Sequence, residues 1–176
     1  AMDLVTLVTL CSVAFDPGLM HALVIVESGG KPWSFRGADS ADRSFTTPEE
    51  AVIAARLVQA DSASIRVGLA GLPTDLLGAT AQPKEAMFEP CPNVALASFR
   101  LERRMETCRI LRPTEPAERC ALATFHRSFE APDWVFADEI MTRFAVGNLA
   151  NPKISRPCGN ASPDTKSDAR EAGESV

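Results

Sequence analysis

The segment from Asp16 to Gly30 restricts the fold more than any other part of the sequence, because it carries signals for both ends of a helix. Asp16 followed by Pro17 is typical of an N-cap and a first helical residue, since proline fits the first turn without losing a hydrogen bond. The adjacent Gly29 and Gly30 favour a stop, because glycine readily adopts the left-handed conformation that ends many helices. The sequence therefore predicts a helix over residues 17–28.

Hydrophobic periodicity and the glycine and proline breakers place the other elements. In the apolar run from Leu4 to Phe15, Thr6, Thr9 and Ser12 recur every three residues, which favours a helix and leaves a strand as the alternative. After residue 30 we expect loop or short extended pieces over 31–46, a helix from Thr47 to about Gln59, and an irregular segment over 61–92. Three further helices are expected from Asn93 to about Leu111, from about Pro116 to Phe129 and from Pro132 to about Val146. Gly147 and Asn148 would end the last of them.

These elements indicate a mainly α fold with one domain over residues 1–150. The chain has 176 residues, of which 45% are apolar, and this is enough for one packed core. Beyond Asn151 the large aliphatic residues are reduced to Ile154 and Val176, among Ser, Pro, Asp, Lys and Glu. We therefore expect residues 151–176 to form a disordered tail.

Charge and apolar length exclude two classes of partner. With 18 basic and 23 acidic side chains, a net charge of -5 and no run of Lys or Arg, the chain lacks the basic stripe that a nucleic-acid backbone requires. The longest apolar run, from Leu4 to Phe15, is much shorter than the ~20 residues of a membrane-spanning helix. We therefore expect neither nucleic-acid binding nor a membrane span.

The cysteines favour disulfides over a metal site. The five cysteines form no CxxC pair, and only His21 and His126 could join them as ligands, so we expect no metal and no cofactor. Disulfides are the better use for four of them, with one left over. Because the first basic residue is Lys31, the sequence has no signal-peptide pattern, and we expect any export signal to have been removed already, with Ala1 and Met2 as a cloning remnant.

Glu27 is the residue that most clearly suggests chemistry. On the predicted helix it shares a face with Met20, Leu23 and Val24, so its carboxyl group faces apolar side chains. Burial and the negative end of the helix dipole both favour the protonated form, which is the form a general acid needs. The alternative is that the last helical turn directs Glu27 into solvent.

Three sequence motifs resemble those of lytic transglycosylases. The glutamate signature of that family is matched by Val26-Glu-Ser-Gly-Gly-Lys-Pro-Trp-Ser-Phe35, and its Gly-Leu-Met-Gln-Ile-Asn motif is matched in part by Val67-Gly-Leu-Ala70. The segment Glu89-Pro-Cys-Pro-Asn-Val94 resembles the Asp-Pro-Cys-x-Asn-Leu of the branch associated with type IV secretion systems. The resemblance covers roughly residues 10–145 in order, and it implies that Glu27 is the catalytic acid.

The second and third motifs depart from the family pattern. Gly71 and Pro73 stand where the family has Gln and Asn, and Phe125-His126 stand where it has a cleft tyrosine and a polar residue. Phe125 could stack on a sugar but cannot donate a phenolic hydrogen bond. By this resemblance the substrate-binding candidates are Ser28, Trp33, Leu69, Gly71, Phe125 and His126.

The resemblance implies a lysozyme-like helical fold with a cleft, and a periplasmic enzyme acting on peptidoglycan glycan strands. Glu27 would protonate the oxygen between N-acetylmuramic acid and N-acetylglucosamine, then accept the C6 hydroxyl proton as a 1,6-anhydro ring closes. Secretion-system subunits are the further partners implied. Two alternatives are a catalytically impaired peptidoglycan-binding or assembly subunit of the same fold, and a helical adaptor without a cell-wall role.

Two further expectations concern the cysteines and the arginines. The family places cysteines where this chain has Cys11 and Cys91, which implies a disulfide between them, while Cys108 and Cys120 flank a helix connection that a second bridge could span. Cys158 would be the free thiol. Arginines 100, 103, 104 and 109 are typical of a solvated helix face, with steering of anionic muropeptides or of a partner as the alternative.

Overall fold

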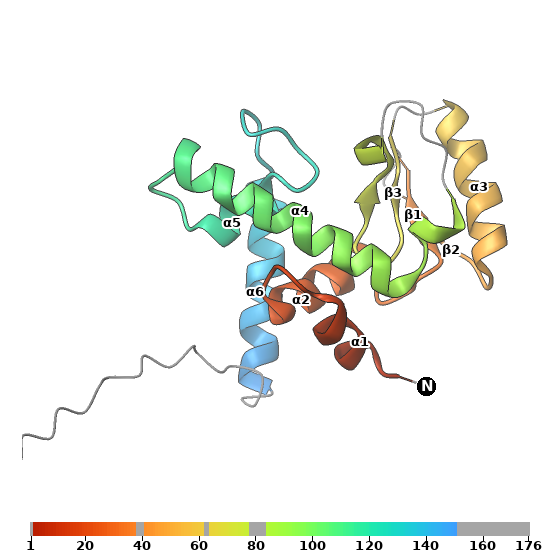
Figure 1. The fold of residues 1–176 in the computed structure, drawn as a ribbon, viewed down its shortest axis with the longest axis horizontal. Helices are drawn as coiled ribbons and strands as arrows, with labels where there is room; N and C mark the ends of the chain where they lie inside the picture. The colour runs from red at the N-terminus through yellow and green to blue at the C-terminus, as the bar shows by residue number, and fades with distance from the viewer. Residues whose placement is uncertain (1, 38–40, 62–63, 78–83, 151–176) are drawn as a thin grey trace, which may run out of the picture.

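The protein is described by a computed structural model, which covers residues 2–37, 41–61, 64–77 and 84–150. These residues form a mainly helical fold, as the sequence predicts, together with one small antiparallel sheet that the sequence does not predict (Figure 1). The helices are α1 (Leu4–Cys11), α2 (Pro17–Ser28), α3 (Pro48–Asp61), α4 (Pro90–Leu111), α5 (Ala117–Ala123) and α6 (Trp134–Ala150). The strands are β1 (Ser34–Arg36), β2 (Asp42–Ser44), β3 (Arg66–Val67) and β4 (Leu72–Pro73), in the order β2-β1-β3-β4, and two 3-10 turns are η1 (Thr74–Leu77) and η2 (Glu85–Met87).

The long helix α4 connects the two regions of the fold. In Figure 1 it runs from the sheet and α3 on one side to α5 on the other, and α1 packs against it. Helices α4, α5 and α6 pack in succession, and α2 packs on both α1 and α6. One cluster of buried apolar residues extends through these contacts and reaches the strands at Phe35 and Val67. The end of α2 therefore meets the sheet, which is where Glu27 lies.

Helix α2 has the bounds that its end signals predict. The Asp16 carboxylate accepts a hydrogen bond from the Leu19 N–H at 2.8 Å, and Pro17 is the first helical residue. At the other end Gly29 adopts a left-handed conformation with φ of 61°. The face that carries Met20 is buried, and Glu27 is buried with it.

Two predicted helix ends are wrong. Helix α5 ends at Ala123 and not at Phe129, because the following carbonyls bind arginine side chains: Arg100 Nε donates to Phe125 O at 2.9 Å, and an Arg112 Nη donates to Phe129 O at 2.8 Å. Helix α6 continues through Gly147 to Ala150, and Gly147 does not adopt the left-handed conformation by which Gly29 ends α2. In addition α4 begins at Pro90, three residues before the predicted start.

Two disulfides join the helices, and both agree with expectation. Cys11–Cys91, with a sequence separation of 80, ties the end of α1 to the start of α4. Cys108–Cys120, with a separation of 12, ties α4 to α5. Cys158 and the expected tail over 151–176 lie outside the described residues. Among the residues that are described, no helix combines the length and the apolar character needed to cross a bilayer.

Candidate functional site

The carboxyl group of Glu27 is buried at the point where α2 meets the sheet. Its side chain is only 1% exposed. Oε1 lies 3.1 Å from Nη1 of Arg66 on β3 and 2.8 Å from Nε2 of His126, which follows α5. Oε2 is buried and has no hydrogen-bond partner among the described residues. One carboxylate oxygen is therefore held by two basic side chains, and the other is left unpaired.

A glycine makes this close approach possible. Gly71 lies between β3 and β4 with φ of +58°, and a Cβ atom there would overlap Oε2 of Glu27. A side chain at this position is therefore incompatible with the observed place of Glu27. The resemblance leads one to expect Gln at position 71. In this chain Gly71 instead leaves room for the buried carboxyl group of Glu27.

Ser28 and Asn93 hold the backbone of the β3–β4 turn against α2. The Ser28 hydroxyl lies 2.8 Å from Leu69 O and 3.0 Å from Val24 O, and it can donate its proton to either carbonyl. The buried Asn93 side chain accepts from Ala70 N–H at 2.8 Å and donates to the carbonyls of Val67 and Met87. These bonds fix the turn that carries Gly71.

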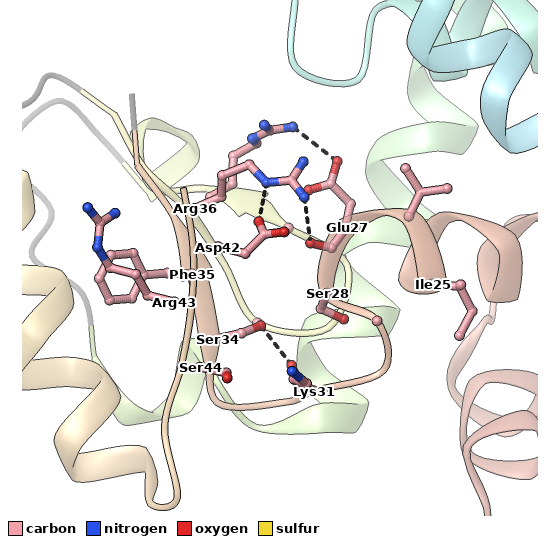
Figure 2. A pocket seen from close by; sticks show the side chains of 15 residues that line it. Ile25, Glu27, Ser28, Lys31, Ser34, Phe35, Arg36, Asp42, Arg43 and Ser44 are labelled. Carbon is pink, nitrogen blue, oxygen red and sulfur yellow. Dashed lines mark hydrogen bonds and ion pairs between the residues drawn. The ribbon is translucent and has the colours of Figure 1, made fainter. Parts of the chain in front are cut away.

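A first cavity, of about 270 Å³, lies beside Glu27 (Figure 2). Its lining includes Glu27, Ser28, Arg36, Asp42 and Gly71. Arg36 forms an ion pair with Asp42, and this hydrogen bond holds the pKa of the Asp42 carboxyl below its usual range. Arg36 also donates to the backbone oxygen of Glu27 at 3.5 Å. A second carboxylate therefore shares the cavity with Glu27, but it is paired with arginine.

A second cavity, of about 610 Å³, lies on the His126 side of the same site and shares Arg36 and Arg66 with the first. Burial lowers the pKa of His126, an effect that the neighbouring Glu27 partly offsets. The neutral imidazole is therefore favoured near pH 7. Its Nδ1 is buried without a hydrogen-bond partner in the described part of the chain.

The structure brings some of the predicted site residues together and separates others. Ser28, Gly71 and His126 surround Glu27. Leu69 and Phe125 are buried and, unlike Glu27, line neither cavity, so stacking of Phe125 on a sugar has no open ring face here. Trp33 is half-buried against the core and lines neither cavity. Across the described ranges no group of three or more His, Cys, Asp or Glu side chains could hold a metal ion.

Sequence reasoning missed Arg66, Arg36 and Asn93. A charged residue between two aliphatic ones, as in Ile65-Arg66-Val67, indicates a short strand with one polar side, and this could have drawn attention to Arg66. Asn93 lies one turn before Ala97 on the apolar face of α4, where a polar side chain needs a buried partner. Nothing local in the sequence indicates that Arg36 reaches Glu27.

The arrangement can transfer a proton. A buried carboxyl group with one fixed oxygen and one unpaired oxygen, beside a cavity, can donate or accept a proton at the unpaired atom. The other oxygen, Oε1, is held by Arg66 and His126. No protein-family model, curated protein or solved structure matches the chain.

Proposed function

We propose that this protein is a peptidoglycan lytic transglycosylase in which Glu27 performs both proton transfers. The observation that carries the proposal is the buried Oε2 of Glu27, which has no partner among the described residues and belongs to a side chain lining the first cavity. Such an atom is suited to hold a proton and deliver it to a ligand oxygen. Arg66 and His126 occupy Oε1, so they orient the carboxyl group without blocking Oε2.

The proposed reaction needs one carboxyl group and no water. Glu27 donates its proton to the oxygen that links N-acetylmuramic acid to N-acetylglucosamine, and the bond from that oxygen to the muramic C1 breaks. The muramic C6 hydroxyl then attacks C1 and gives its proton to the Glu27 carboxylate, which restores the starting state. Most glycosidases instead use two carboxyl groups. Asp42 is ion-paired with Arg36, which lowers its pKa, so it has no proton to donate and leaves Glu27 as the acid in this cavity.

Two further features support the same proposal. A glutamate near the end of a helix in a mainly α fold is what the resemblance to lysozyme-like transglycosylases leads one to expect. Two disulfides are compatible with an exported, periplasmic protein, because disulfides persist in oxidising compartments. Local opening of the cell wall for a secretion apparatus is the role we propose for the activity.

A second candidate function is a catalytically impaired peptidoglycan-binding or assembly subunit of the same fold. The contacts of Arg66 and His126 with Oε1 favour this alternative, because they hold the Glu27 side chain in place as buried structural residues are held. The burial of Phe125 also favours it, since this removes the aromatic surface expected in the cleft.

Product analysis separates the two functions. Purified sacculi are incubated with the 176-residue chain, and the released muropeptides are identified by mass spectrometry. Transglycosylation predicts 1,6-anhydro ends, whereas hydrolysis gives reducing ends and contradicts the proposed reaction. Binding to sacculi without any release would identify the impaired subunit.

A further inference from the structure

The second cavity is strongly basic in an acidic protein. Five arginines line it, against two aspartates, although the whole chain has a net charge of -5. The arginines come from separate parts of the sequence, and they are Arg36, Arg66, Arg100, Arg104 and Arg127. The aspartates are Asp75 and Asp133. The cavity therefore concentrates positive charge that the sequence distributes over several segments.

Three of these arginines have no carboxylate partner in the described part of the chain. Arg100 donates through Nε to Phe125 O at 2.9 Å, and the Arg104 guanidinium lies 4.5 Å from the ring centroid of Phe129. Neither of them, nor the exposed Arg127, forms an ion pair with any residue that the structure describes. Asp133 uses an oxygen to accept from the N–H of residue 136 at the start of α6. The positive charges of these three arginines are therefore not paired with a carboxylate of the described residues.

Burial and mutual repulsion make these charges unfavourable. Burial, together with the nearby Arg104, lowers the pKa of Arg100 to about 10, and Asp75 offsets this only in part. Burial also lowers the pKa of Arg104. A bound anion would relieve both effects, because it supplies the missing counter-charge and accepts the unused guanidinium hydrogen bonds.

We infer that the second cavity binds a carboxylate carried by the peptide substituent of a muramic residue. The inference rests on the proposed function, because it takes the glycan strand as the ligand. Arg36 and Arg66 line both cavities, and His126 lines the second while its Nε2 contacts Glu27. A strand with its scissile bond at Glu27 would therefore place the peptide of the adjoining muramic residue close to the arginines.

Binding of a disaccharide-peptide tests the inference without turnover. The probe is N-acetylglucosaminyl-N-acetylmuramyl-peptide, which lacks the bond that the enzyme is proposed to break. It is prepared with free peptide carboxylates and with the same carboxylates converted to primary amides. By calorimetry the 176-residue chain should bind the free form at least about tenfold more tightly, because charge-assisted hydrogen bonds are lost in the amide. The preference should shrink as salt is added.

Matched variants assign the preference to this cavity. The double substitution Arg104→Gln with Arg127→Gln should bring the two affinities within about twofold of each other, as expected when the guanidinium bonds are lost. Arg127→Gln alone, at an exposed position, should lower the preference without affecting the fold. Arg103→Gln is the control, since Arg103 is exposed on the same helix and lies outside the cavity lining, and it should keep the full preference.

Three results would overturn the inference. The first is equal affinity of the chain for the free and the amidated probe, and the second is an undiminished preference in the double variant. The third is equally tight binding of the disaccharide without its peptide, because this would assign the bound anion to the lactyl carboxylate. These outcomes are independent of the proposed function, because sacculus cleavage is measured separately. Anhydro products without any preference for the free carboxylate would support the proposed enzyme activity and contradict the anion site. A preference for the free carboxylate without anhydro products would support the anion site in a binding protein.

Discussion

Gly71 is the residue whose substitution most directly disturbs Glu27. In Gly71→Ala the new Cβ would overlap Oε2 of Glu27, so the carboxyl group must move. We expect sacculus cleavage to be lost and the free energy of unfolding to fall by about 2–4 kcal/mol, from overpacking added to left-handed strain. Denaturant unfolding and product release measure the two effects.

Gly29 provides the matched control. It has a similar φ of +61°, but a Cβ there meets nothing within 4 Å. Gly29→Ala should therefore cost only the strain, about 1–2 kcal/mol, and should leave cleavage intact. If the two variants behave alike, contact with Glu27 is not the reason that glycine is needed at position 71.

Asp42 tests whether one carboxyl group is sufficient. Because Arg36 holds Asp42 as a charged partner, we expect Asp42→Asn to keep anhydro product release within about tenfold of the parent, well short of the ~10²–10⁴ lost with a general acid or base. Mass spectrometry of the products gives the comparison. A loss as large as that of a Glu27 variant would mean that Asp42 takes part in the chemistry.

His126 should make stability depend on pH. Burial lowers its pKa in the folded state, so the unfolded chain, with a pKa of about 6.5, binds the proton more readily. The free energy of unfolding is therefore highest above about pH 6.5, where the histidine is neutral in both states. It falls as the pH drops below this value, by ~1.4 kcal/mol in total for each unit by which folding lowers the pKa.

Unfolding measured between pH 8 and 5 tests this dependence. His126→Gln should flatten the slope. The control is His21→Gln, which removes a histidine whose pKa is also lowered by burial but which is less buried, so it should flatten the slope less. An unchanged slope in His126→Gln would show that folding does not lower the pKa of this histidine.

The local sequence predicts Glu27, and the family resemblance adds Ser28, Gly71 and His126, but neither predicts Arg66. Glu27 lies on the apolar face of its own helix, so the sequence of that helix is enough to identify it as an unusual carboxyl group. Its partners Arg66 and His126 lie 39 and 99 residues away, and only the folded chain brings them to the carboxyl group. The resemblance places Phe125 in the cleft, but the turn after Ala123 directs its side chain into the core.

At the scale of elements, the two disulfides should differ in their effect on stability. In the chain-entropy model a loop of 80 residues corresponds to about 4.5 kcal/mol and one of 12 residues to about 3 kcal/mol. Replacing Cys11 and Cys91 by Ser should thus destabilise the protein by ~1.5 kcal/mol more than replacing Cys108 and Cys120. Denaturant unfolding of both double variants gives the difference. The reverse order would show that strain or residual structure outweighs chain entropy.

Helices with local end signals were predicted well, and those ended by tertiary contacts were not. The bounds of α2 follow from Asp16 and Gly29, which act within their own turn. Helix α5 ends early because Arg100 on α4 binds a carbonyl that a longer helix would use, and a single segment does not show this. Short strands such as β3 have too few residues for a period to appear.

At the scale of the whole molecule, charge is arranged in a way that composition conceals. The net charge of -5 indicates an acidic protein, yet the arginines of the second cavity converge beside Glu27. The sequence predicts that the arginines of α4 form a solvated helix face. Two of them, Arg100 and Arg104, instead line this partly buried cavity. The fold therefore creates an electrostatic environment at the site opposite in sign to that of the chain.

The most direct test of the central claim compares the parent with Glu27→Gln on purified sacculi. The amide preserves the shape of the side chain but has no proton to transfer, so release of 1,6-anhydromuropeptides should fall by at least ~10²–10⁴. Circular dichroism and sacculus binding should be unchanged, because the substitution leaves the core intact. Equal release of anhydro products by the parent and by a folded Glu27→Gln variant would contradict the assignment of Glu27 as the catalytic acid.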